Sequence, residues 1–223
     1  MQNYLFFFDV NGTLIKDKKN TDLAYKETLI ELFKIKNPLG DIETTARSDK
    51  AILKNFLHKN DIQFTESLYN IFLKHYEVQL KKYLDKDLWE ENDDVKKFVK
   101  YLIKRKWNMA LLTGNLELGA KYKLESVNLW KYFEVGGYGE DGEIRNDIAS
   151  SALSKSKKYF KIEKFEDLYV IGDTEKDFKV SKFLNAKSIL FAKNKKKKKN
   201  LENLNADYVI TDFNEAIDIF KER

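Results

Sequence analysis

Three apolar runs of strand length, each ending in polar residues at a turn, constrain the fold of this chain most strongly. They are YLFFFDVNGT at 4–13, WNMALLTGN at 107–115 and DLYVIGDTEKD at 167–177. Such uninterrupted apolar runs are typical of strands buried on both faces of a parallel sheet. Shorter strand candidates are KSILFA and DYVITD, and helical patterns occur at about 93–105, 117–128, 146–160 and 175–184. This alternation predicts an α/β fold: a doubly wound parallel sheet, Rossmann-like in its core.

The segment from about 16 to 88 differs, because it contains no convincing strand. Its periodic stretches predict amphipathic helices: TDLAYKETLIELFKI, SDKAILKNFLHK and TESLYNIFLKHYEVQLKKYL. We therefore expect a helical unit, residues 16–88, inserted after the first strand, and an α/β core made of residues 1–15 and 89–223.

The scarcity of cysteine and histidine narrows the chemistry. The chain has no cysteine, which excludes thiolate nucleophiles, cysteine-bound zinc and disulfides. The two histidines, His58 and His75, lie in amphipathic helical stretches, where packed or surface histidines are the usual occupants. A Ser-His-Asp triad or a zinc-histidine site is therefore disfavoured, and catalysis must use carboxylates, hydroxyls and cations.

The sequence contains no candidate membrane span or secretion signal. There is no run of about 18 apolar residues, and the N-terminal YLFFF stretch is too short for a signal-peptide core. We therefore expect a cytoplasmic protein that does not bind membranes.

The net charge of +5 has a local source. Lys193 and the run Lys195–Lys199 contribute six positive charges, and taking these six from +5 leaves −1 for the rest of the chain. The run is interpreted as a solvated loop or the start of a helix. A polyanion site is the alternative, but no aromatic interleaving or nucleic-acid motif accompanies the run, so a nucleic-acid partner is disfavoured.

Arginine is rare in this lysine-rich chain. The four arginines therefore indicate places that require the planar, forked guanidinium group: Arg47, Arg105, Arg145 and Arg223.

Asp9, Thr113 and Asp173 each fall at the carboxyl end of a predicted strand, where open α/β sheets bind ligands. Each has an ordinary explanation when taken alone. An NG dipeptide is a hairpin signal, TGN suits a turn, and an aspartate can cap a helix. Their joint occurrence, in this order along the chain, instead indicates a functional site.

These groups suit the binding of magnesium and phosphate. Magnesium prefers oxygen ligands, and Asp9 and Asp173 bring carboxylates from two strands. Asp177 follows Asp173 by one helical turn and would point toward the same place, as an outer partner that orients the ligands. The hydroxyl of Thr113, with the backbone N–H groups that follow as far as Asn115, can hold phosphoryl oxygens.

DVNGT, LLTGN and VIGDTEKD resemble the first, second and fourth motifs of the haloacid dehalogenase superfamily. The resemblance covers the predicted core, about 1–15 and 89–212. The segment KLESVNLWKYFEVGGYGEDGEIR looks most like the phosphoglycolate-phosphatase branch, and TARSDKAIL is similar to the loop and helix of that branch's helical cap. The resemblance implies a mobile cap that excludes water and selects the substrate.

The resemblance also implies roles for individual residues. It implies magnesium-dependent hydrolysis of a small-molecule phosphate monoester, with Asp9 as the nucleophile that forms an aspartyl-phosphate. Magnesium would bind Asp9, the backbone carbonyl of Asn11, and Asp173. The residues expected to bind the phosphorylated metabolite are Gly12, Thr113, Gly114, Asn115 and, from the cap, Arg47.

The family's third motif supplies a cation, usually lysine, from a helix before the last catalytic strand. Arg145 is the choice here, because it follows YGEDGEI at the start of a predicted helix. Lys155 is the rival, in a surface-like lysine series, and both assignments stay open at this point.

The chain departs from the family pattern at two positions. The residue two after the nucleophile is usually an aspartate that protonates the leaving group and then activates water, and here it is Asn11, which can do neither. Ala46 stands where the cap loop commonly has glycine. Asn11 leaves two functions open: a weak phosphatase, or a catalytically silent phosphate- and metabolite-binding protein. The sequence selects neither a substrate nor an oligomeric state.

Overall fold

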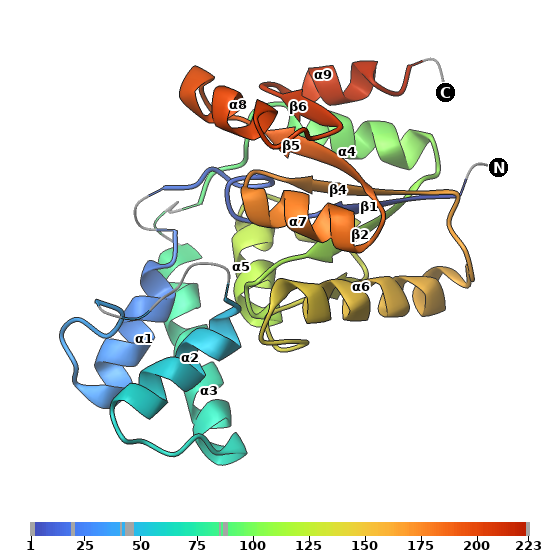
Figure 1. Cartoon of the computed structure of the whole chain (residues 1–223). Helices are drawn as coiled ribbons and strands as arrows, with labels where there is room; N and C mark the ends of the chain where they lie inside the picture. The colour runs from blue at the N-terminus through green and yellow to red at the C-terminus, as the bar shows by residue number, and fades with distance from the viewer. Residues whose placement is uncertain are drawn as a thin grey trace.

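The computed structural model describes residues 3–18, 21–40, 42, 47–84, 86 and 89–221. Within these residues a six-stranded sheet forms the centre, with all neighbouring strands parallel and in the order β3-β2-β1-β4-β5-β6 (Figure 1). The strands are β1 (Tyr4–Phe8), β2 (Asn108–Leu112), β3 (Gly136–Gly137), β4 (Asp167–Gly172), β5 (Lys187–Phe191) and β6 (Tyr208–Ile210). The predicted α/β fold with a doubly wound parallel sheet is confirmed.

Strand β1 shows why an uninterrupted apolar run becomes a central strand. All five of its residues are buried. Leu5 and Phe7 belong to one core and Phe6 and Phe8 to the other, because successive side chains point to opposite faces of a sheet. Phe6 also stacks on Tyr169 of β4, with ring centroids 4.7 Å apart. A strand that is apolar on both faces is stable only where helices cover both.

Helices cover both faces of the sheet (Figure 1). Helices α6 and α7 share one core, and α4, α5 and α9 contribute to the other. Helix α8 packs near β5 and β6. These helices are α4 (Val95–Lys104), α5 (Glu117–Ser126), α6 (Arg145–Phe160), α7 (Glu175–Phe183), α8 (Lys195–Glu202) and α9 (Phe213–Asp218).

Strand β3, the 3₁₀-helix η1 (Trp130–Tyr132) and helix α9 were not expected from the sequence. Strand β3 consists of Gly136 and Gly137 alone, without the apolar run that indicates a strand, and it forms because the edge of β2 pairs with it. Helix α9 is six residues long, too short for a clear helical period. The lysine run forms the first turns of α8. A helix start was one of the two structures predicted for this run.

The described residues of the segment after β1 include the helices α1 (Leu23–Phe33), α2 (Asp49–Lys59) and α3 (Glu66–Leu84). They lie together beside the sheet, and aromatic contacts from Tyr25 to Phe72 and Tyr76 join α1 to α3 (Figure 1). Ala46 lies outside the described residues. None of the helices in the described part of the chain combines the length and the apolar character of a membrane span.

Candidate functional site

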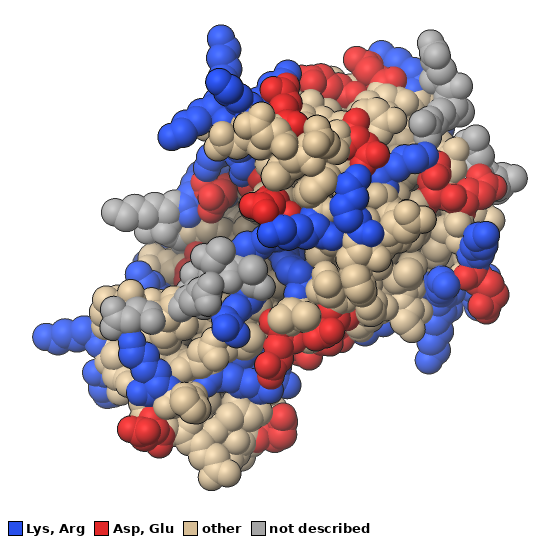
Figure 2. Space-filling model, in the orientation of Figure 1, with Lys and Arg blue, Asp and Glu red and all other residues tan. Residues whose placement is uncertain are grey.

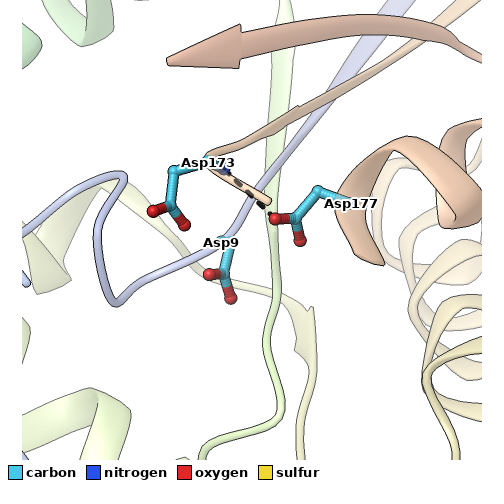
Figure 3. A group of neighbouring side chains, drawn as sticks. All are labelled: Asp9, Asp173 and Asp177. Carbon is cyan, nitrogen blue, oxygen red and sulfur yellow. Dashed lines mark hydrogen bonds between the residues drawn. The ribbon is translucent and has the colours of Figure 1, made fainter. Parts of the chain in front are cut away.

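Three buried carboxylates meet at the carboxyl ends of β1 and β4 (Figure 3). Asp9 follows β1, Asp173 follows β4, and Asp177 lies in the first turn of α7. Since β1 and β4 are parallel neighbours, Asp9 and Asp173 reach the same edge of the sheet. One oxygen of each of the three carboxylates lies within 4.8 Å of the others. Three buried carboxylates so close together repel one another, so nearby cations are needed to stabilise their charged forms.

Arg145, the first residue of α6, supplies one cation. Its Nη2 donates to Oδ1 of Asp9 at 3.3 Å, and its Nη1 donates to the carbonyl of Leu112 at 3.3 Å. Burial raises the pKa of Asp9, and the positive charge of Arg145 opposes that rise. Lys155 instead pairs with Asp141 at 2.7 Å, and its side chain is 43% exposed. Of the two rival cations, Arg145 is therefore the one that contacts Asp9.

Asp177 holds the start of α7 and also faces the carboxylate cluster. Its Oδ2 accepts hydrogen bonds from the backbone N–H groups of Asp173 and Thr174, at 3.1 and 3.0 Å, and from the Thr174 hydroxyl at 2.7 Å. Its Oδ1 is buried, has no hydrogen-bond partner among the described residues, and lies 3.9 Å from Arg145. A buried carboxylate oxygen left without a donor is suited to a cation, directly or through water.

The donor set fits a small divalent cation. Asp9, Asp173 and Asp177 offer carboxylate oxygens, which magnesium prefers. Gly12 has a φ of +80°, and a Cβ atom built there would collide with the carboxylate of Asp173. Glycine is therefore required both for the backbone conformation and for the close approach of the loop to Asp173.

Asp173 also contacts a cation that the sequence analysis assigned to solvent. Burial raises the pKa of Asp173 to about 7, and the ammonium of Lys197, which contacts Oδ2, opposes that rise. Lys197 belongs to the lysine run at the start of α8, so its interpretation as a wholly solvated segment is wrong at this residue. A homopolymeric run carries no periodicity that could distinguish the one inward lysine.

The loop Thr113–Asn115 lies between Asp9 and helix α2. Thr113 is buried, its backbone N–H donates to the carbonyl of Gly137 at 3.0 Å, and its hydroxyl accepts from the backbone N–H of Asn115 at 3.3 Å; its side chain also helps to lower the pKa of Asp9. The Asn115 amide donates to Asp49 of α2 at 3.3 Å. Thr113 is therefore directed at the carboxylates, whereas Asn115 joins the sheet edge to the insertion.

Asn11 lies in a separate ionic network. Its amide nitrogen donates to Asp22 at 3.3 Å, and its amide oxygen accepts from Lys123 at 3.1 Å. Lys123 also donates to Asp22 at 2.5 Å, and its side chain is only 1% exposed. Lys123 was not predicted as a site residue; it lies on α5 among buried residues that include Ala120 and Leu124.

The site opens into a cavity of about 260 Å³. Its lining includes eight of the ten predicted site residues: Asp9, Asn11, Arg47, Thr113, Gly114, Asn115, Arg145 and Asp173. Five other lining residues with polar side chains are not among the predicted site residues: Asp17, Asp22, Asp49, Thr174 and Lys176. Burial and the neighbouring Arg145 lower the pKa of Lys176. Gly12 and Asp177 lie behind the lining, against Asp173.

A family model described as haloacid dehalogenase-like hydrolase matches residues 6–191. No curated protein sequence matches the chain. Similar solved structures include a predicted phosphatase from Clostridium acetobutylicum, with 21% identity, a TM-score of 0.64 and 100% of each chain covered. CbbY from Rhodobacter sphaeroides, in complex with phosphate, has 14% identity, a TM-score of 0.69 and 94% of each chain covered. A predicted phosphoglycolate phosphatase from Haemophilus somnus has 14% identity, a TM-score of 0.67 and 99% of each chain covered. These likenesses show a shared fold.

Proposed function

The chain belongs to the haloacid dehalogenase-like hydrolase family, and we propose that it hydrolyses phosphate monoesters of small metabolites with magnesium, through an aspartyl-phosphate on Asp9. The observation that carries this proposal is the buried cluster of Asp9, Asp173 and Asp177 with Arg145 against Asp9. The phosphate bound to CbbY and the phosphatase descriptions of the other similar structures support the choice of substrate class.

Asp9, Asp173 and the backbone carbonyl of Asn11 would hold the magnesium ion, with Asp177 orienting them from behind. When bound, the ion would offset the negative charge of the carboxylates and of the phosphoryl group. The unpartnered Oδ1 of Asp177 and the close approach of Gly12 to Asp173 support a cation in this position.

Asp9 is the nucleophile in this proposal. Its carboxylate attacks phosphorus, the bond from phosphorus to the ester oxygen breaks, and the leaving group departs with the bonding electrons. Arg145 can engage a phosphoryl oxygen as well as Asp9, because a guanidinium donates from several N–H groups. The Thr113 hydroxyl and the N–H groups of Gly114 and Asn115 would hold the remaining oxygens. Water then attacks the phosphorus of the aspartyl-phosphate and gives a proton to solvent, the bond from phosphorus to the Asp9 oxygen breaks, and inorganic phosphate leaves as the Asp9 carboxylate is restored.

Asn11 makes this turnover weak. An amide can neither protonate the leaving oxygen nor remove a proton from water, and such assistance is typically worth about 10²–10⁴-fold. Lys123 and Asp22 already hold the amide, which keeps it from rearranging to take another part. We expect the present chain to act chiefly on esters with good leaving groups, such as aryl phosphates.

Residues 16–88 would act as a cap over the cavity. The contacts of Asp49 with the backbone N–H of Leu116, at 3.0 Å, and with the Asn115 amide support closure against the sheet edge. Arg47, which lines the cavity from the insertion side, would contact the non-phosphate end of the substrate. A cavity of about 260 Å³ favours a small metabolite.

The alternative function is a phosphate- or metabolite-binding protein without turnover. The observation that favours it is Asn11 itself. Its amide hydrogen-bonds Asp22 and Lys123, and neither bond requires an acid or base at this position. Such a protein would keep the residues that bind the cation and the phosphate, but it would not hydrolyse the ester.

The test is phosphate release from a panel of phosphorylated metabolites, with Asp9→Asn as the matched control. We expect slow, magnesium-dependent release by the present chain and none by the Asp9→Asn variant. Calorimetric magnesium titration of Asp173→Ala should show severely weakened binding. Release that survives Asp9→Asn would contradict the proposed nucleophile, and unchanged magnesium affinity would remove Asp173 from the metal site.

A further inference from the structure

Lys197 is set apart from the other lysines of its run. Its ammonium contacts Oδ2 of Asp173, and its side chain is 23% exposed. The lysines on either side of this turn, Lys195, Lys196 and Lys199, are exposed. Figure 2 shows Lys and Arg side chains projecting into solvent over the region of α8. Lys197 therefore contacts the candidate site, whereas Lys195, Lys196 and Lys199 are surface charges.

The fold accounts for the inward direction of Lys197. Strand β5 pairs with β4, so the loop after β5 emerges at the same sheet edge as Asp173. Asn194 then caps α8 by accepting a hydrogen bond from the backbone N–H of Lys197 at 2.9 Å. The cap holds the first turn of α8 in the orientation from which Lys197 reaches the carboxylate.

This contact places a cation on a carboxylate that the proposed metal site requires. An ammonium group and a divalent cation are attracted by the same oxygens and repel each other. Asp173 is 4% exposed, so solvent screens this repulsion only partly. For magnesium to bind Asp173, either the Lys197 ammonium must move away or the ion must bind beside a second positive charge.

We propose that Lys197 is an intramolecular competitor of the divalent cation and sets the metal concentration at which the site fills. The inference rests on the magnesium site of the proposed function. In the metal-free protein Lys197 neutralises a buried carboxylate that would otherwise be unpaired. The cost of displacing it lowers the affinity of the site for magnesium.

The experiment is calorimetric titration of the whole chain with magnesium chloride alone, comparing the parent protein with Lys197→Met. Methionine keeps an unbranched stem of similar length and removes the charge. The titration is repeated at several alkaline pH values, because Lys197 lowers the pKa of Asp173 and its removal strengthens the competition of protons for the carboxylate. Two controls accompany it: Lys196→Met, which removes an exposed lysine of the same turn, and Lys197→Arg, which keeps the charge.

We expect Lys197→Met to bind magnesium at least about tenfold more tightly than the parent, because a charge beside a divalent ion at about 4 Å costs on the order of 2 kcal/mol even in water. The affinities of Lys196→Met and Lys197→Arg should stay within about threefold of the parent. Equal or weaker binding by Lys197→Met, with its thermal unfolding intact, would overturn this inference and leave the proposed function standing. Absence of magnesium binding by all four proteins would overturn both.

Discussion

Replacing Asp173 with Asn should stabilise the metal-free protein and abolish binding at the proposed magnesium site. Asparagine has nearly the shape of a protonated aspartate and carries no charge. Asp173 is buried, and its pKa is raised from 3.8 to about 7. The fold therefore favours the protonated carboxyl, and a neutral amide should suit it better than a carboxylate.

The magnitude follows from the pKa of this one group. A carboxyl whose pKa is raised in the folded state contributes stability below its unfolded value, here 3.8, and loses it as the pH rises through about 7. At pH values above both, the loss corresponds to about 4 kcal/mol. This pKa already includes the attraction between Asp173 and Lys197, but the amide of asparagine would place N–H donors beside the Lys197 ammonium, which offsets part of the gain. We expect a net gain of about 2–3 kcal/mol, or roughly 5–10 °C in Tm for a chain of this size.

The assay is thermal unfolding of both proteins in a chelator at several pH values. The advantage of Asp173→Asn should be largest above pH 7 and should disappear below about pH 4, where both side chains are neutral. Adding magnesium should raise the Tm of the parent and not that of the variant, since a ligand stabilises only the protein that binds it. Asp218→Asn, which changes an exposed aspartate, is the control and should alter stability by less than about 0.5 kcal/mol. A variant that is less stable at alkaline pH, or whose advantage does not change with pH, would refute the reasoning.

Asn11→Asp should raise phosphate release from an alkyl phosphate at least about a hundredfold, because it restores a group that exchanges protons. If turnover stays at background across the substrate panel while magnesium still binds, the binding-protein function replaces the hydrolase. Arg145→Ala should abolish binding of a phosphate analogue measured by calorimetry, whereas Lys155→Ala should leave it unchanged; the opposite pattern would reassign the cation. Gly12→Ala should abolish magnesium binding and lower the free energy of unfolding by more than about 1 kcal/mol. The added methyl group would collide with the carboxylate of Asp173, and alanine is strained at the φ of +80° found here. Normal magnesium titration and thermal unfolding of that variant would contradict the close approach.

The fold and the strand-end residues could be predicted because their signals are local. The apolar runs specify strands buried on both faces, and the residue that ends each run is visible in the sequence. Asp9 and Asp173 follow two such runs, and parallel neighbouring strands bring such residues to one edge without further information. The edge strand β3 could not be predicted, because Gly136 and Gly137 carry no strand signal of their own.

The choice between Arg145 and Lys155 needed the tertiary structure. Both residues lie on α6, ten residues apart, which corresponds to about 15 Å along a helix. Only the position of α6 against the sheet determines which end of it meets Asp9. Arg145 begins the helix at the edge where the strands end, and Lys155 lies farther along it, paired with Asp141.

The cations around the site were decided by tertiary structure alone. Lys123 contacts Asn11 across 112 residues of sequence, and Lys197 contacts Asp173 across 24. A lysine has the same sequence signature whether its ammonium lies in solvent or on a buried carboxylate, because its long stem lets the charge reach either. The sequence by itself therefore determined the parallel sheet and the acidic residues at its edge. Which lysines neutralise or surround those residues depended on how α5 and α8 pack against the strands.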